Sequence, residues 1–447
     1  MAPQHDAVTT SERAQTTDTG LKRAIGGRLL FVFILGDVLG AGIYALVGVL
    51  AGESGGAFWV PLLVALGLSL LTAASYAELV TKYPKAGGAA VFAHRAYGRD
   101  DIAFLVGFSM LAAGLTSVAG LSLAFAGDYL GVLVDVPAAP AAVLFLVAVA
   151  LLNLRGISES LKANLVMTVV EVTGLLVVVA LGLVVLSRGD ADPGRVLELP
   201  QGTGPVPAVL GGALIAFYSF VGFETSANVA EEMRRPARDY PRALLGGLAA
   251  AGVVYVLVAL TVSAAVPTDR LVSSSGPLLE VVRVADVGLP PSVFSVVALV
   301  AVANGALLTS IMTSRLTYGM AADGLLPSVL ARLLPGRRTP VVAIVVTTAA
   351  SAALALTGEL GTLAETVVLL LLVVFISTNG AAIVLRSRPV EHEHFHAPRI
   401  VPWLALLSCV ALLTQQSAGV YLRGALLLAV GGVLYALTRL GRDRTTA

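Results

Sequence analysis

Long apolar segments recur along the whole chain, and short polar stretches that hold most of the charged residues separate them. A helix needs about 20 apolar residues to cross the core of a bilayer, and twelve segments come near that length. Backbone polar groups inside a bilayer must bond within the protein, so such segments form helices. The pattern therefore predicts an all-helical membrane protein with spans at residues 29–50, 58–80, 102–130, 138–154, 163–186, 206–230, 244–266, 290–314, 340–357, 362–385, 401–415 and 420–438.

The basic residues are unevenly distributed between the two sides of this arrangement. Twelve spans place 24 of the 29 Lys and Arg residues on the side of the N-terminus and five on the other side. Because cytoplasmic loops carry the excess of basic residues, we expect both chain ends in the cytoplasm. Residues 1–24 are polar and rich in Ser and Thr, which predicts a disordered cytoplasmic tail. Arginine greatly outnumbers lysine, a bias typical of GC-rich bacterial genomes, so the expected location is a bacterial cell membrane.

The composition excludes several functional classes. Apolar residues make up 57% of the chain and charged residues 13%, against about 25% charged in a typical soluble domain. A net charge of +1 argues against a nucleic-acid partner. The single cysteine, Cys409, excludes an intramolecular disulfide and a cysteine-based metal cluster. His392, His394 and His396 fall in a predicted loop and are interpreted as solvated. No phosphate-binding loop motif is present, so ATP is not the expected fuel, and neither a cofactor nor a metal is expected.

Glycine interrupts the first and the sixth expected span. Three glycines fall within residues 36–42, and Gly222 lies in the middle of residues 217–224. Each glycine lowers helix propensity by about 1 kcal/mol. Gly42 and Gly222 are 180 residues apart, each in the first span of a five-span block. Paired interruptions of this kind indicate an inverted-repeat transporter with its binding site at the breaks. The alternative is that these glycines only let helices pack closely.

An interrupted helix deep in a membrane favours one type of ligand. The free N–H groups at the start of the second half attract an anion. The free carbonyl groups before the break can accept hydrogen bonds from an ammonium group. A zwitterion carries both groups close together, and an α-amino acid is the simplest such molecule.

Motifs in and around these spans resemble those of the amino acid–polyamine–organocation transporter superfamily, and most closely its cationic-amino-acid-transporter-like branch. The first-span motif is Gly40-Ala41-Gly42-Ile43-Tyr44, and the sixth-span motif runs from Phe217 to Glu224. Other matching motifs are Tyr76-Ala77-Glu78, Lys82-Tyr83-Pro84-Lys85-Ala86-Gly87, Ala230-Glu231-Glu232, Pro241-Arg242, Ser314-Arg315, Asp323-Gly324, Leu326-Pro327 and Thr339-Pro340. Together the motifs cover the chain from about residue 28 to 440.

The resemblance implies two five-helix repeats of opposite orientation, with helices 1 and 6 broken, followed by two additional helices. On this chain the repeats are expected at residues 25–187 and 206–388, and the additional helices at 400–440. It also implies that backbone amides of the first break hold the substrate carboxylate, that carbonyls at both breaks hold the amino group, and that an aromatic side chain of the sixth span gates the site. The substrate-binding residues implied are Val38, Gly40, Ala41, Gly42, Ile43, Phe217, Tyr218, Ser219, Phe220 and Val221.

Three acidic residues fall inside expected spans, where a charge is costly and usually marks function. Asp37, Glu171 and Glu224 are expected about 9–12 Å from the cytoplasmic ends of their spans, in one layer beside the breaks. Proton-coupled members of the superfamily often have a lysine in the fifth span, where this chain has Glu171. We predict Glu171 as the main protonation site, with Asp37 and Glu224 as further proton-coupling candidates. The alternative is a permanently neutral, hydrogen-bonded Glu171 that holds helices together.

Two further roles stay open in these spans. Asp37 is interpreted as a cap for the second half of the broken first helix, as a proton or cation site, or as a contact for a cationic substrate side chain. Thr309 and Ser310 offer oxygen ligands for a sodium ion, together with carbonyls of the first break. Hydroxyls on helices more often bond back to their own carbonyls, which disfavours the sodium site.

The expected function is a secondary active transporter that moves amino acids by alternating access. Proton symport is the favoured coupling, and the alternatives are an amino acid/polyamine exchanger and a sodium-coupled carrier. A membrane enzyme is disfavoured because no His lies within a span to act as a base, and a channel because the broken helices replace a repeated polar pore segment. The expected partners are an amino acid, protons and the lipid bilayer. Asp37 favours a cationic substrate and the aromatic residues Tyr44 and Tyr218 favour a neutral one, so the amino acid stays open, as does the oligomeric state.

Overall fold

The computed structural model describes residues 25–39, 41–84, 88–155, 160–200, 202–334 and 339–446. The expected tail at residues 1–24 and the expected site residue Gly40 lie outside the described residues. Within the described part, every regular element is a helix, and one isolated β-bridge joins Ile25 to Met233. The predicted all-helical architecture is therefore confirmed for these residues.

The helices follow the order of the apolar segments. The first part of the chain forms α1 Gly27–Leu39, α2 Ala41–Ser54, η1 Gly55–Ala57, α3 Trp59–Lys82, α4 Gly88–Tyr97, α5 Asp100–Phe125, α6 Asp128–Gly131, α7 Ala138–Leu154, α8 Ser160–Arg188 and η2 Pro193–Leu197. The second part forms α9 Pro205–Tyr218, η3 Phe223–Glu232, α10 Pro236–Ala265, α11 Thr268–Ser273, α12 Pro277–Ala285, α13 Pro291–Ala322, η4 Ser328–Ala331, α14 Val341–Thr357 and α15 Leu360–Leu385. The last two helices are α16 Val401–Leu413 and α17 Ala418–Thr446.

The lengths of these helices fit a protein that crosses a membrane several times. Among the described residues, nine helical stretches are long and apolar enough to span a bilayer. Three shorter apolar helices, α7, α14 and α16, stand where the sequence predicts the fourth, ninth and eleventh spans. Large apolar side chains on the outside of the bundle, such as Leu144 and Val166, are exposed as lipid contact requires. The chain is therefore a multi-pass membrane protein.

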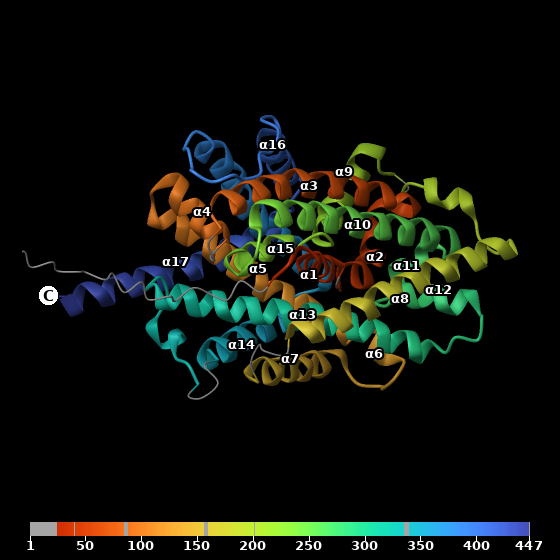
Figure 1. Cartoon of the computed structure of the whole chain (residues 1–447). Helices are drawn as coiled ribbons and strands as arrows, with labels where there is room; N and C mark the ends of the chain where they lie inside the picture. The colour runs from red at the N-terminus through yellow and green to blue at the C-terminus, as the bar shows by residue number, and fades with distance from the viewer. Residues whose placement is uncertain are drawn as a thin grey trace, which may run out of the picture.

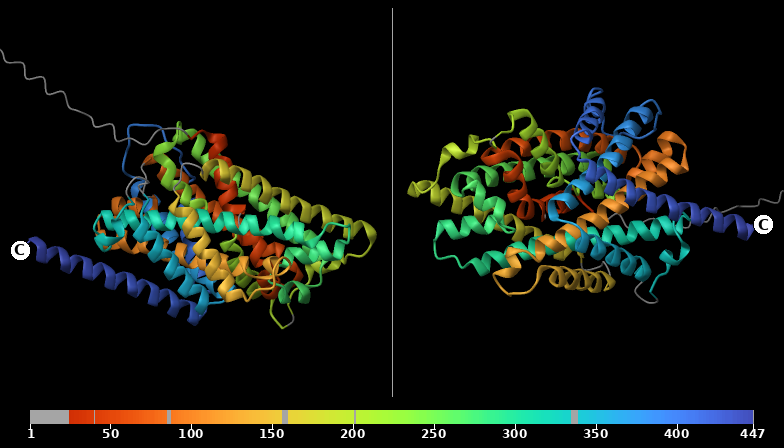
Figure 2. Two further views of the ribbon diagram at one scale, coloured as in Figure 1. Left: turned by 90° about the horizontal axis from the view of Figure 1, so that it is seen from below. Right: turned by 180° about the vertical axis from the view of Figure 1, so that it is seen from behind.

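Short helices lie at both ends of the bundle (Figure 1). The helix α4 lies at the same end as the C-terminus, whereas α6, α11 and α12 lie at the opposite end. The last helix, α17, runs along the outside of the bundle, and its end projects beyond the other helices (Figure 2). The middle of the bundle is therefore formed by helices other than α17.

A cluster of aromatic rings anchors the chain after α9. The ring centroid of Phe223 lies 5.4 Å from that of Phe375 on α15 and 5.8 Å from that of Tyr76 on α3. The ring of Phe217 lies 5.9 Å from that of Phe375. Offset and edge-on aromatic pairs of this kind contribute about 0.5–1.5 kcal/mol each beyond the area they bury. The irregular stretch between Phe217 and Phe223 is thus fixed at both ends.

A buried ion pair joins α3 to the segment after α15. Arg386 donates from Nε to Oε1 of Glu78 at 2.9 Å and forms a second contact between its terminal nitrogen and Oε2. The backbone N–H of Ala397 donates to the same carboxylate at 3.1 Å. Glu78 belongs to the aromatic-Ala-Glu motif of the second span, and its structural role is to hold residues 386–397 against α3.

Candidate functional site

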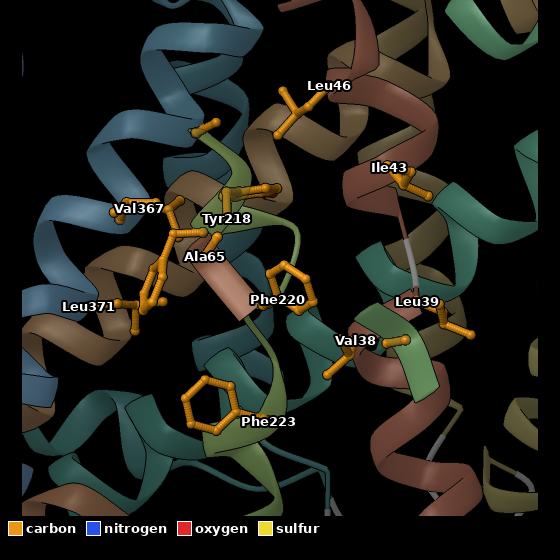
Figure 3. Close-up of a cluster of buried hydrophobic side chains, with 14 of the residues drawn as sticks. Val38, Leu39, Ile43, Leu46, Ala65, Tyr218, Phe220, Phe223, Val367 and Leu371 are labelled. Carbon is orange, nitrogen blue, oxygen red and sulfur yellow. The ribbon is translucent and has the colours of Figure 1, made fainter. Parts of the chain in front are cut away.

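The sixth span is interrupted at the place that its sequence indicates. The helix α9 ends at Tyr218, and the next three amides bond three residues back, as in the bond of 3.0 Å from Val221 N to Tyr218 O. Gly222 has φ 122° and ψ −32°, a conformation that side chains rarely adopt, and the 3₁₀ helix η3 follows it. Figure 3 shows Tyr218, Phe220 and Phe223 along this stretch, between Val367 and Leu371 on one side and Val38 and Leu39 on the other.

The chain around the first expected break lies directly against the second. The helix α1 ends at Leu39 and α2 begins at Ala41, on either side of Gly40. A β-carbon added at Gly42 would lie 2.8 Å from Cα of Ser219, and one at Gly222 would lie 2.9 Å from the backbone oxygen of Asp37. Both distances are too short for a real side chain. Glycine at these two positions therefore lets the segments touch, so the packing role that the sequence left open for them is present here.

A tyrosine that the sequence did not single out binds backbone carbonyls of both segments. The hydroxyl of Tyr255, on α10, donates to the carbonyl oxygen of Val38 at 2.5 Å and lies 3.1 Å from that of Ser219. Tyr255 is fully buried, and its ring lies against Phe220 with the centroids 5.3 Å apart. The hydroxyl has one proton, which it donates to Val38, so the carbonyl of Ser219 beside it and the second lone pair of the Val38 carbonyl stay available as acceptors.

A partly open cavity lies between these segments and α5, α13 and α15. Of the substrate-binding residues that the sequence predicts, Val38, Gly42, Tyr218, Ser219 and Val221 line it. Ile43, Phe217 and Phe220 are buried behind the lining instead. Ala41 begins α2, and its side chain is not among those described.

Two of the three predicted acidic residues, Asp37 and Glu224, line this cavity. The carboxylate of Asp37 accepts a hydrogen bond from the hydroxyl of Thr225 on η3. The carboxylate of Glu224 accepts from the backbone N–H of Gly222 at 3.0 Å. Glu224 thus holds the backbone immediately before η3, and Asp37 connects α1 to η3. Thr225 is a site residue that the sequence did not indicate.

The third acid, Glu171 on α8, is fully buried and is not among the residues that line the cavity. Its Oε1 accepts from the side-chain amide of Asn304 on α13 at 3.1 Å, and the same amide donates to Oδ1 of Asn164 at 3.1 Å. Its Oε2 has no hydrogen-bond partner in the part of the chain that the structure describes. Near this carboxyl α1 packs tightly against α8, since a β-carbon added at Gly36 would lie 2.0 Å from the hydroxyl oxygen of Thr168.

The wall of the cavity opposite the breaks is mainly apolar. It is made by Met110, Ala113, Leu121, Met312, Val367 and Leu371. Its polar side chains are Ser117, Thr309 and Thr313, and the hydroxyl of Ser117 lies 3.0 Å from that of Tyr218. The cavity therefore combines backbone carbonyls and carboxylates on one side with an apolar surface on the other.

The candidates for ion binding are separated from one another. Thr309 lines the cavity, whereas the hydroxyl of Ser310 lies 3.4 Å from the side-chain amide of Asn153 on α7. The two hydroxyls thus have different surroundings, which does not favour a sodium site built on both. Among the described residues, no three His, Cys, Asp or Glu side chains are grouped as metal ligands.

Comparison with known proteins identifies the family. The family model described as amino acid permease matches residues 25–422. The branched-chain amino acid permease BcaP of Bacillus subtilis is 26% identical over 95% of this chain and 94% of its own length. The uncharacterized transporter Rv1999c of Mycobacterium tuberculosis is 33% identical over 94% of this chain and 92% of its own. The chloroplastic cationic amino acid transporter 9 of Arabidopsis thaliana is 29% identical over 72% of this chain and 59% of its own. The chain thus belongs to the amino acid permease family of the amino acid–polyamine–organocation superfamily, a family of transporters rather than enzymes.

Proposed function

We propose that this permease is a secondary active transporter that carries an amino acid through the cavity between α1, α2, α9 and η3. The observation that carries this proposal is the contact of the interrupted sixth span with the chain around the first expected break, at Ser219 and Gly42, which places backbone groups of both at one cavity. The carbonyls of Val38 and Ser219 would bind the substrate ammonium group, and amides at the start of α2 would bind its carboxylate.

The arrangement of helices supports two inverted repeats, residues 25–187 and 206–388, followed by two additional helices at 400–440. The fourth expected span of each half is a helix of 17 residues, α7 and α14. The short helix after the second span of the first half, α4, lies at the opposite end of the bundle from α11 and α12, which follow the corresponding span of the second half (Figure 1). In an inverted repeat, the corresponding connections of the two halves lie at opposite ends of the bundle.

The direction in which the cavity extends supports an inward-open state, with both chain ends in the cytoplasm. It extends along α5 from Leu121 to Met110, toward the end of the bundle where α4 and the C-terminus lie. At the other end Tyr129 donates to the backbone oxygen of Tyr44 at 2.9 Å, and both rings lie 6.5 Å from that of Phe294. Alternating access would open this aromatic layer and close the other end.

Protons are the coupling ion that these surroundings favour. Glu171 is buried with one unpartnered oxygen, and no side chain in the described contacts of its carboxyl is basic. A buried carboxyl without a counter-charge is most stable when it carries a proton. Asp37 and Glu224 face the cavity and would pass the proton between Glu171 and water.

An amino acid with an apolar side chain is the substrate that the cavity favours. Its apolar wall, which includes Leu121, Val367 and Leu371, would pack against such a side chain. The name of the relative BcaP, a branched-chain amino acid permease, points to the same substrate class.

Uptake by the purified full chain in proteoliposomes tests this function. We expect labelled leucine to accumulate when the outside is one pH unit more acidic than the inside, with valine and isoleucine as competitors and arginine as a weak one. The control is the same vesicles without protein. Absence of uptake for every amino acid tested would contradict the proposal, and conductance of millions of ions per second would indicate a channel instead.

A further inference from the structure

A basic groove lies between the first turns of α1 and α10, away from the substrate cavity. Its rim is made by Arg28, Arg234, Arg235 and Arg242, and the apolar side chains of Phe31 and Val32 also line it. The start of α1 is in close contact with the start of α10 and the residues just before it. The backbone N–H of Arg234 donates to the carbonyl of Ile25 at 3.1 Å, and a β-carbon at Gly27 would lie 3.1 Å from Cγ of Asp239. The groove thus has a fixed shape.

The positive charge of this groove is mostly uncompensated. Asp239 also lines it and forms an ion pair with Arg235, whose Nε lies 3.4 Å from Oδ2. No ion pair is present for Arg28, Arg234 or Arg242 among the side chains that the structure describes. At the same end Arg386 is paired with Glu78 and Arg99 with Asp101. The distribution of basic residues across a membrane explains why arginines occur at this end, and the groove brings together three that form no ion pair with any described side chain.

The position of the groove matches the level of lipid head groups. Both α1 and α10 begin here and then continue as apolar stretches that span the membrane. Farther along α10, the apolar side chains of Val253 and Leu257 are exposed, 59% and 43%, on the same helical face as Arg242. An amphiphile with a phosphate at its head would place that phosphate among the arginines and its acyl chain along α10. Arginine binds phosphate oxygens with two parallel hydrogen bonds where the geometry allows.

We propose that the groove between α1 and α10 binds the head group of an anionic phospholipid. Because α1 also carries Asp37 and Val38, a lipid bound here would contact the helix that lines the substrate cavity. The site does not depend on which substrate the protein carries.

Native mass spectrometry of the purified full chain in detergent, with added phosphatidylglycerol or phosphatidylcholine, tests this site. We expect one phosphatidylglycerol molecule to be retained in preference to phosphatidylcholine. In the double variant Arg28→Gln/Arg242→Gln, retention of phosphatidylglycerol should fall about 30-fold, since each arginine near an anionic head group contributes about 1 kcal/mol and 1.4 kcal/mol corresponds to tenfold. Arg28→Lys/Arg242→Lys should restore most of the binding, because it keeps the charge.

A matched control replaces two arginines elsewhere, Arg270→Gln/Arg423→Gln, and should leave retention unchanged. Equal retention by the parent chain and the Arg28→Gln/Arg242→Gln variant would overturn the proposal. Millimolar inorganic phosphate should not displace the lipid. If it does so as effectively as added phosphatidylglycerol, the groove is a site for free phosphate and the lipid assignment is wrong.

Discussion

Replacing Glu171 with Gln is expected to abolish the response of uptake to a pH gradient while uptake without a gradient persists. In the parent chain, uptake should rise as the outside becomes more acidic, because the carboxyl is protonated outside and releases its proton inside. A gradient of one pH unit corresponds to about 1.4 kcal/mol per proton, or about tenfold accumulation. Gln has nearly the same shape and keeps an oxygen that can accept from Asn304, so the fold should be preserved. For this variant the accumulation ratio should be about 1.

The measurement is leucine accumulation in proteoliposomes over a series of imposed pH gradients. The control variant is Glu365→Gln, which removes a partly buried carboxyl at the start of α15, and it should behave like the parent chain. Unchanged pH dependence in Glu171→Gln would remove Glu171 from proton coupling. It would leave this residue the structural role of joining α8 to α13 through Asn304.

The substitution Gly42→Ala is expected to reduce amino acid binding about tenfold or more. The added methyl group would lie 2.8 Å from Cα of Ser219, a backbone atom that cannot rotate away, so the two segments must separate. Overpacking of this kind typically costs about 1–3 kcal/mol. Separation would also move the carbonyls of Val38 and Ser219 apart. Binding would weaken, because both carbonyls are proposed to bind the same ammonium group.

Thermal stabilisation by leucine and leucine uptake both measure this effect. Gly67→Ala and Gly319→Ala are matched controls, because an added methyl group at either position meets no atom within 4 Å. Both should bind and transport leucine as the parent chain does. Size-exclusion chromatography separates loss of binding from loss of folding. Normal leucine binding by a folded Gly42→Ala variant would show that close contact at this point is not needed for the site.

The sequence predicts the helices well where long apolar stretches determine them and less well where the backbone leaves the α-helix. Residues 206–230 have the composition of one span, yet only the part up to Tyr218 is α-helical. The position of Gly222 marks this interruption, but only the structure reveals that a 3₁₀ helix follows it. The short helix α16 has 13 residues, fewer than the apolar composition of its segment predicts.

The predicted site residues divide according to the direction of their side chains. Tyr218 and Ser219 line the cavity, whereas Phe217 and Phe220, on either side of them, are buried in the aromatic packing. In an irregular turn the side chains follow neither the periodicity of a helix nor that of a strand. Sequence spacing therefore does not determine which of these four side chains faces the cavity. Tyr255 and Asn304 were not predicted because their roles arise only when α10 and α13 meet α1 and α8.

The central claim is that backbone groups at the two breaks bind both the amino group and the carboxylate of the substrate. Binding of analogues that each lack one of these two groups tests this claim most directly. The amino acid that is taken up best is compared with its amine, which lacks the carboxylate, and with its carboxylic acid, which lacks the amino group, by calorimetry on the purified full chain. If backbone groups at the two interruptions hold both ends, each analogue should bind about 10- to 100-fold more weakly, since a hydrogen bond to a charged group contributes about 1.5–3 kcal/mol. An amine or an acid that binds as tightly as the intact amino acid would contradict the account.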